Sequence, residues 1–447
     1  MTLARASYVS LVVFLGCGSS DTAGANGGAA AMGGTTSGAA GAISSVGGAG
    51  GKAGATSSVG GAAGNAGAAT AGGGSGGVAG KGSAGLGGSA GASGAGASGG
   101  APIGGAGGGK AGSASGGTSG NGGSAGATSA YPIVDPPSGF DGLAKSAPIT
   151  VTKDGQVVSD VAIANPTGDC LVIDGHANVT VSHVAIGPCG GAAIRVSNGS
   201  SITITGSYLH DSVGPGVDVG GSNGVTVTGS HFARNASGMY ALTSTKIVFE
   251  GNTVLNVQGP IPRGQLVQFD KVSGGGNRVR CNVGQNVLGK STPEDALNFY
   301  QSNGAPNDPI LVEGNRVLGG GPSMSGGGIL LGDGGGSYIT ARKNVVVDPG
   351  QYGLGVPSGT HMTLTDNVVY GAAQSFTNVG VYVWEQYKLP CDAIEVSKNH
   401  VMFANAKGTP NPYWDGGGCG TVSGVDTNDF TSPVAPSVID VTPSVCP

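Results

Sequence analysis

The sequence predicts an all-β protein, a parallel β-solenoid of about nine or more coils preceded by a long low-complexity region. A short apolar-x-apolar strand recurs at intervals that run from 22 residues, between Val219 and Ala241, to 32 residues, between Phe299 and Leu331. A second phrase recurs beside it, since KIVFEGNTV at 246–254 returns as PILVEGNRV at 309–317. Units of this length cannot close a core alone, so they must bury their apolar faces by stacking.

In the first strand of each unit, inward apolar residues alternate with residues that face outward. The second strand of each unit ends three residues before an Asn or Ser. The expected first strands are 171–173, 194–196, 217–219, 239–241, 267–269, 297–299, 329–331, 354–356 and 381–383. The expected second strands are 225–227, 247–249, 310–312, 339–341, 362–364 and 394–396. Because side chains alternate along a strand, the apolar pairs point inward. The recurring Asn would lie inward at a corner and bond to the same residue one coil away.

Residues 18–130 form a region of different composition. They are almost all Gly, Ala, Ser, Thr, Asn or Val, in a chain of 447 residues that contains 94 Gly. Such a segment cannot bury enough apolar surface to offset its ordering entropy, so we expect a disordered linker. One folded domain over 131–447 follows, and its repeat ends near residue 405 in a Pro- and Gly-rich cap over the last sheet edge.

Residues 1–17 predict an export signal. One positive charge precedes a short apolar run, which is too short to span a membrane, and FLGC then places Cys17 after a small residue. The segment resembles a bacterial lipoprotein signal, in which Cys17 would be acylated. Ordinary secretory cleavage between residues 16 and 19 is the alternative. We therefore expect an exported protein, held at an outer membrane or cell surface through a lipid on Cys17, or otherwise secreted.

The cysteines of the folded region are even in number, which fits an oxidising compartment. Cys170 and Cys189 are separated by about one repeat, and so are Cys391 and Cys419, so neighbouring coils can join each pair. Cys281 falls at a core position of the repeat. A buried free thiol therefore remains an alternative to a disulfide for Cys281.

The recurring Asn residues match the asparagine ladder of a known superfamily. They are Asn252, Asn315, Asn344, Asn367 and Asn399. From about residue 149 to 403 the chain resembles the right-handed parallel β-helix superfamily that includes pectate lyase-like proteins. The resemblance implies the fold and a polysaccharide partner bound along the outer face of one sheet. It leaves the activity open, because this helix carries lyases, glycosidases, epimerases, tailspikes and adhesins.

On the outer face of the first strand series, polar and aromatic residues gather over the middle coils. Alternation places Gly332 in the outward column that contains Asp270. Aromatic side chains on this face can stack on sugar rings, and amides can bond sugar hydroxyls. The predicted substrate-binding residues are Tyr240, Gln268, Asn298, Tyr300 and Trp384.

Carboxylates occur in the same coils, which are the longest and so have the longest loops. A glycosidase needs two carboxyl groups, about 5 Å apart for retention and up to about 9.5 Å for inversion, and Asp270 and Asp333 lie two coils apart. A lyase needs a base and a positive charge or metal, for which Lys271 and the oxygen ligands Glu294 and Asp295, holding Ca²⁺, are the candidates. Solvated surface and turn residues are the structural alternative.

The charge balance limits the partners. The net charge is −5 and the chain has no basic stripe, which argues against nucleic acid. We expect a monomeric surface protein that binds extracellular polysaccharide, with cleavage by elimination or hydrolysis as the finer hypothesis. A non-catalytic adhesin or structural module is the alternative. A groove over the middle coils with converging carboxylates favours the enzyme, and a flat face favours the adhesin.

Overall fold

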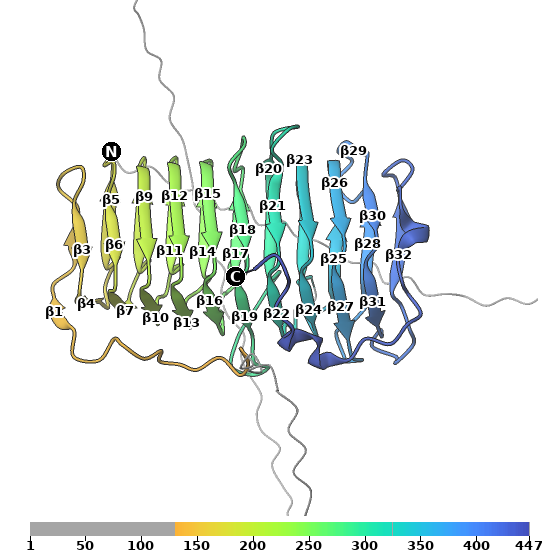
Figure 1. Cartoon of the computed structure of the whole chain (residues 1–447), viewed down its shortest axis with the longest axis horizontal. Helices are drawn as coiled ribbons and strands as arrows, with labels where there is room; N and C mark the ends of the chain where they lie inside the picture. Colours follow the sequence, from red (N-terminus) through yellow and green to blue (C-terminus); the bar gives the residue numbers. More distant parts are fainter. Residues whose placement is uncertain (1–129, 324, 447) are drawn as a thin grey trace, which may run out of the picture. The chain divides into compact units, whose positions relative to one another are not determined.

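The computed structural model describes residues 130–323 and 325–446, and its regular elements are almost all parallel β-strands stacked in successive coils (Figure 1). Most coils give one strand to each of three ladders. The predicted signal, Cys17 and the predicted linker up to residue 129 lie outside the described residues.

The first ladder corresponds to the first strand series expected from the sequence. Its strands are β2 (Ile149–Thr150), β5 (Leu171–Asp174), β8 (Ile194–Ser197), β11 (Val217–Gly220), β14 (Met239–Leu242), β17 (Val267–Asp270), β20 (Leu297–Asn303), β23 (Ile329–Arg342), β25 (Tyr352–Val356), β28 (Val379–Trp384) and β32 (Tyr413–Gly417). All nine strands expected in the first series are present.

The second ladder shares the long strand β23, whose C-terminal half pairs within it. Its other strands are β3 (Val157–Ser159), β6 (Thr180–Ser182), β9 (Ser200–Thr205), β12 (Asn223–Thr228), β15 (Thr245–Glu250), β18 (Arg278–Arg280), β21 (Ile310–Glu313), β26 (Gly359–Thr365), β29 (Cys391–Asp392) and β30 (Glu395–Ser397).

The third ladder is an 11-stranded sheet in strict chain order. Its strands are β1 (Ala144–Ser146), β4 (Val161–Asn165), β7 (Ala185–Cys189), β10 (Tyr208–His210), β13 (His231–Ala233), β16 (Thr253–Leu255), β19 (Val283–Gln285), β22 (Arg316–Leu318), β24 (Val345–Val347), β27 (Val368–Gly371) and β31 (His400–Phe403). Two short 3₁₀ helices follow, η1 (Val425–Thr427) and η2 (Pro436–Asp440).

Apolar side chains of all three ladders fill the interior. Val267 and Phe269 of β17 are fully buried, whereas Asp270 at the end of that strand is partly exposed. Phe269 packs edge-to-face on Phe299 of the next coil, with ring centroids 5.4 Å apart. The stacked coils thus bury the apolar rows that no single coil could bury.

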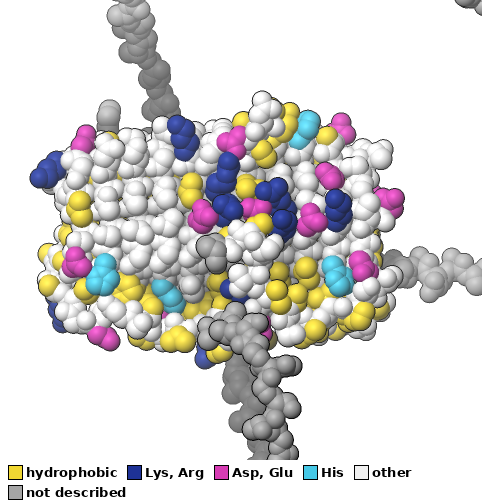
Figure 2. Space-filling model, in the orientation of Figure 1, with side chains coloured by type: hydrophobic (Ala, Val, Ile, Leu, Met, Phe, Trp, Pro, Cys, Tyr) yellow, Lys and Arg dark blue, Asp and Glu magenta, His cyan; other side chains and the backbone are white. Residues whose placement is uncertain are grey.

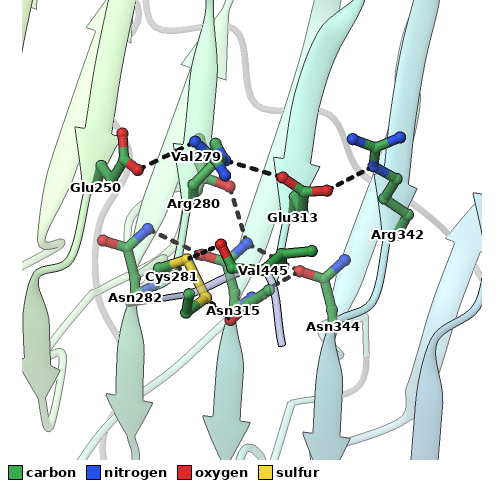
Figure 3. Close-up of a disulfide and its surroundings, with 12 residues drawn as sticks. Glu250, Val279, Arg280, Cys281, Asn282, Glu313, Asn315, Arg342, Asn344 and Val445 are labelled. Atoms are coloured by element: carbon green, nitrogen blue, oxygen red, sulfur yellow. Dashed lines mark hydrogen bonds and ion pairs between the residues drawn. A yellow bond between two sulfur atoms is a disulfide. The ribbon is translucent and has the colours of Figure 1, made fainter. Parts of the chain in front are cut away.

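The predicted asparagine ladder is present, and Figure 3 shows its central part. The side-chain amide of Asn315 donates to the Val279 carbonyl and to Oδ1 of Asn344, and both distances are 2.9 Å. Its own Oδ1 accepts bonds from the backbone and side-chain nitrogens of Asn282 at 3.1 and 2.8 Å. Two further residues belong to the ladder: Asn282 lies between Asn252 and Asn315, and Asn428 extends the ladder beyond Asn399.

A row of alternating charges runs beside the asparagine ladder on the second ladder (Figure 3). Arg280 pairs with Glu250 at 3.2 Å and with Glu313 at 3.0 Å, and Arg342 pairs with Glu313 at 2.7 Å. In Figure 2, charged side chains gather over these middle strands, and the coils nearer the N-terminal end of the stack show mostly uncharged surface. Opposite charges on successive coils favour this register.

Three disulfides cross-link the coils. Cys281 is bonded to Cys446, so the free-thiol alternative is wrong (Figure 3). The C-terminal segment turns back along the stack and brings Cys446 to the middle coils, a return that the repeat could not predict. Both disulfides predicted from spacing are present, namely Cys170–Cys189 and Cys391–Cys419.

Segments from both ends of the described chain lie along the third ladder. The hydroxyl of Tyr131 donates to the carbonyls of Gly284 and Arg316 at 3.1 and 3.0 Å, and Ile439 of η2 packs against Val345. These contacts cover part of the outer face of the third ladder. Across the described ranges, no helix combines the length and apolar character needed to cross a membrane.

Candidate functional site

A bulge in β23 brings Asp333 into line with Asp270. In the strand register Asp270 pairs with Tyr300, and Tyr300 pairs with Asp333. The alternation predicted Gly332, rather than Asp333, for this outward column. In the structure Gly332 has a φ of 75°, and a Cβ at this position would lie 2.1 Å from the carbonyl oxygen of Ser358. The alternation is therefore wrong by one residue at this position. Bulges of this kind redirect side chains and occur next to active sites.

One amide connects two carboxyl groups beneath this column. Asn298 donates from Nδ2 to Oδ2 of Asp295 at 2.7 Å and to Oδ2 of Asp333 at 3.0 Å. The hydroxyl of Tyr352 donates to Oδ1 of Asp295, and the hydroxyl of Tyr387 donates to Oδ1 of Asp333 at 2.7 Å. We call Asp270, Asp295, Asn298 and Asp333 the carboxylate cluster.

Burial raises the pKa of both bridged carboxyl groups. The pKa of Asp295 rises to about 7, chiefly through desolvation and next through the charge of Glu294. Desolvation also raises the pKa of Asp333, and hydrogen bonds from Asn298 and Tyr387 oppose the rise. Asp295 is only 5% exposed, whereas Asp333 keeps part of its surface accessible. Asp333 can therefore meet a ligand directly, and Asp295 acts on it through Asn298.

Asp270 occupies the other end of the column. It accepts a 2.7 Å hydrogen bond from the hydroxyl of Tyr240, and Nζ of Lys271 lies 3.5 Å from its Oδ1. That oxygen is buried and accepts no hydrogen bond from the described residues. The guanidinium of Arg263 lies 3.6 Å above the Tyr240 ring. One face of the Tyr240 ring, which was predicted to stack on sugar, is therefore occupied. Lys271, a predicted catalytic residue, has a side chain that is 52% exposed.

The other predicted sugar-binding residues divide into two groups. Gln268 and Asn298 are 8% and 2% exposed, and both bond to protein groups, which conflicts with the expectation that they face sugar hydroxyls. Tyr300 and Trp384 are partly exposed on the same face. Trp384 packs edge-to-face on Trp414, with ring centroids 5.6 Å apart.

Donors already occupy the oxygens predicted to bind Ca²⁺. Glu294 accepts hydroxyl hydrogen bonds from Ser323 at 2.7 Å and Ser325 at 2.5 Å, and the oxygens of Asp295 accept from Tyr352 and Asn298. Within the described part of the chain, no three His, Cys, Asp or Glu side chains converge in a way that could hold a metal ion. Each carboxylate oxygen has two lone pairs, so these hydrogen bonds leave acceptor capacity, and Ca²⁺ binding by Glu294 and Asp295 stays a prediction.

Two cavities lie away from the carboxylate cluster. The larger, about 310 Å³, is beside the Cys281–Cys446 disulfide, and Glu250 and Arg316 also line it. The smaller, about 10 Å³, is inside the core near Leu266. The larger cavity therefore belongs to the docking of the C-terminal segment rather than to the carboxylates.

Comparison with known families concerns the coils just described. The family model described as "Right handed beta helix region" matches residues 148–303. Together with the parallel register of the three ladders, this match decides the fold. The fold is a right-handed parallel β-helix. A comparison with curated protein sequences gives no match.

Solved structures similar to this β-helix have low sequence identity. PfbA, a surface adhesin of Streptococcus pneumoniae, is 12% identical at a TM-score of 0.40, over 63% of this chain and 71% of that one. The catalytic domain of a GH87 alpha-1,3-glucanase in complex with nigerose is 13% identical at a TM-score of 0.44, over 64% of this chain and 58% of that domain. A tailspike protein of an E. coli bacteriophage is 11% identical at a TM-score of 0.27, over 64% and 59%.

Three aromatic residues near the cluster were missed by sequence reasoning. Tyr352 lies at the start of β25, Tyr387 lies in the loop after β28, and Trp414 lies on β32. The loop of Tyr387 follows no repeat, so no pattern marks it. Trp414 lies beyond residue 405, in the segment predicted to be a cap. The alternation of Tyr413 and Trp414 is the signal that could have predicted one more strand of the β-helix there.

Proposed function

We propose that the outer face of the first ladder binds polysaccharide outside the cell and that Asp270 and Asp333 hydrolyse a glycosidic bond there. The observation that carries this proposal is their shared column, in which the strand of Tyr300 separates them. Two strand spacings amount to about 9.6 Å. This distance is close to the upper end of the range of about 6.5–9.5 Å used by inverting glycosidases.

The two carboxyl groups then have different roles. Asp333, whose pKa is raised by burial, holds a proton and gives it to the glycosidic oxygen as the bond from the anomeric carbon to that oxygen breaks. Asp270 takes a proton from a water molecule whose oxygen bonds to the anomeric carbon from the opposite side. Asn298, Asp295 and Tyr387 hold the Asp333 carboxyl in place and restrict its access to water.

Elimination has less support from the same geometry. A lyase must neutralise the carboxylate of a uronate while a base removes the neighbouring proton. The two cations beside the column are already engaged, since Lys271 pairs with Asp270 and Arg263 lies over Tyr240. Lys271 would be the base if elimination were observed.

The proposed location follows from the cross-links. Three disulfides are typical of proteins outside the reducing cytosol, where extracellular polysaccharide is the substrate at hand. Anchoring by a lipid on Cys17 and a monomeric state belong to the same proposal.

The test is an incubation of the full chain with a panel of neutral and acidic polysaccharides, in which reducing ends and the ultraviolet absorbance of unsaturated ends are followed together. Asp270→Asn and Asp333→Asn should each lower the release of reducing ends at least about a hundredfold. Asp366→Asn, at an exposed turn after β26, is the matched control and should leave the rate unchanged. Unsaturated ends would mean elimination, and binding without cleavage would favour the non-catalytic adhesin.

A further inference from the structure

A group of aromatic side chains lies on the same face as the carboxylate cluster, toward the C-terminal end of the stack. Trp414 is in register with Tyr382 of the preceding coil. Tyr382 is in turn in register with Gly355, and Gly355 with Leu330, which lies in the same coil as Asp333. Three strand spacings separate the coil of Asp333 from that of Trp414, or about 14 Å. We call Trp384, Tyr387 and Trp414 the aromatic platform.

The platform is exposed at Trp414 and partly exposed at Trp384 and Tyr387, and its two indoles pack against each other. Trp414 is 44% exposed although it lies on the last strand of the ladder, where a side chain that only sealed the edge would bury its ring. Gly416 lies against both indoles, since a Cβ there would come 2.5 Å from Cγ of Trp384 and 2.6 Å from Cη2 of Trp414. The apolar residues Leu330, Tyr352, Val379 and Tyr382 support Trp384 from below.

Tyr387 connects the platform to the proposed reaction. Its hydroxyl donates to Oδ1 of Asp333 at 2.7 Å, and its ring remains partly exposed. A flat, apolar ligand that lay on Trp414 and Trp384 would therefore meet the Asp333 carboxyl next. Sugar rings of a chain that follows the stack axis have this shape, with apolar faces and polar edges.

The charges around the platform determine which sugars suit it. Glu385 follows Trp384 in the sequence and Asp415 follows Trp414, and Lys388 is the exposed cation nearest in sequence. A uronate chain would bring further negative charge to this surface, where like charges repel. An uncharged chain adds no such charge.

From these observations we propose that the aromatic platform binds an uncharged glycan chain whose sugars continue across Tyr387 to Asp333. The proposal rests on the proposed hydrolase function and extends it by naming the substrate class. An uncharged substrate also agrees with hydrolysis, because elimination requires a sugar that carries a carboxylate beside the carbon from which the proton is removed.

The experiment compares binding of two sets of probes to the full chain by affinity electrophoresis and calorimetry. The uncharged probes are glucans, mannans and galactans, and the acidic probes are polygalacturonate and alginate. The full chain carries Asp333→Asn to prevent turnover and is combined with Trp414→Ala or with Met402→Ala. Met402 is the matched control, because it is 45% exposed at the same end of the stack but lies on β31 of the third ladder.

We expect at least one uncharged glycan to bind, Trp414→Ala to weaken that binding at least tenfold, Trp414→Phe to restore most of it, and Met402→Ala to leave it unchanged. Tighter binding of the acidic probes, lost on Lys388→Ala, would overturn the proposal, and so would failure of every uncharged probe to bind. If an uncharged glycan binds through Trp414 but the chain without Asp333→Asn never cleaves it, the hydrolase proposal fails and the platform assignment stands.

Discussion

The Nδ2 amide of Asn298 lies 3.0 Å from Oδ2 of Asp333, two residues that lie 35 positions apart in the sequence and on successive strands of one ladder. The same nitrogen lies 2.7 Å from Asp295. One buried donor thus serves two carboxyl groups whose pKa values are both raised, and its removal should affect both.

Replacing Asn298 by Leu, which has a similar volume, should lower the free energy of unfolding by about 1–3 kcal/mol for each carboxyl oxygen left without a donor. The loss should be larger at pH 8 than at pH 5, because an ionised carboxylate needs the donor more than a protonated one. Urea unfolding at the two pH values measures it. Asn303→Ala, at an exposed position on the same strand, is the control, and an equal loss at both pH values would contradict the bridging role.

Asp295 should make the protein less stable as the pH rises. Its pKa is 3.8 in the unfolded chain and about 7 in the folded one, so the folded state binds the proton more tightly. Its stabilising contribution is complete below pH 3.8 and is lost as the pH rises through about 7, a change on the order of 4 kcal/mol. Asp295→Asn should flatten unfolding free energy against pH over this window, and parallel curves for the two proteins would rule out the assignment.

The asparagine ladder should be strongly stabilising at its centre. Asn315 is 1% exposed, and Asn315→Leu would remove the hydrogen bonds that Asn315 makes with the Val279 carbonyl and with the backbone N–H of Asn282. At about 1–3 kcal/mol for each of these two orphaned groups, the total loss should be about 2–6 kcal/mol. Guanidinium unfolding tests this, with Asn405→Leu at an intermediate-exposure site outside the ladder as comparison. A loss no larger than that of the comparison variant would mean that the ladder is dispensable.

The disulfides should differ in their effect on stability. The Cys281–Cys446 bond closes a separation of 165 residues and the Cys170–Cys189 bond closes one of 19. Chain entropy gives about 5 and about 3 kcal/mol, respectively. Pairwise replacement by Ala should therefore lower the denaturant midpoint more for the longer loop. The reverse order would show that the C-terminal segment docks without contributing to the stability of the coils.

Much of the fold follows from the sequence, because every coil repeats the same local rule. The inward pairs, the corner asparagines and the short-range disulfides each depend on alternation or on one repeat of spacing, as with Cys170 and Cys189. The return of the C-terminal segment to Cys281 depends on contacts between residues far apart, such as Ile439 with Val345, for which no repeat gives a signal.

The candidate site was predicted less completely. Asp270 and Asp333 were placed two coils apart, but the bulge that moves Asp333 into the column by one residue arises from the Gly-rich run after Leu331. Burial of Gln268 and Asn298 could not be foreseen, because alternation gives the direction of a side chain and says nothing about the loops that cover it. Tyr387 lies on such a loop.

The most direct test of the hydrolase proposal is proton NMR of the products released from an uncharged polysaccharide by the full chain, recorded before the anomers equilibrate. With Asp270 and Asp333 acting two coils apart, the new reducing end should first appear as the anomer opposite to that of the substrate bond, and Asp333→Asn should abolish its appearance. First appearance of the retained anomer, or unchanged release in Asp333→Asn, would contradict the proposed roles of these two carboxyl groups.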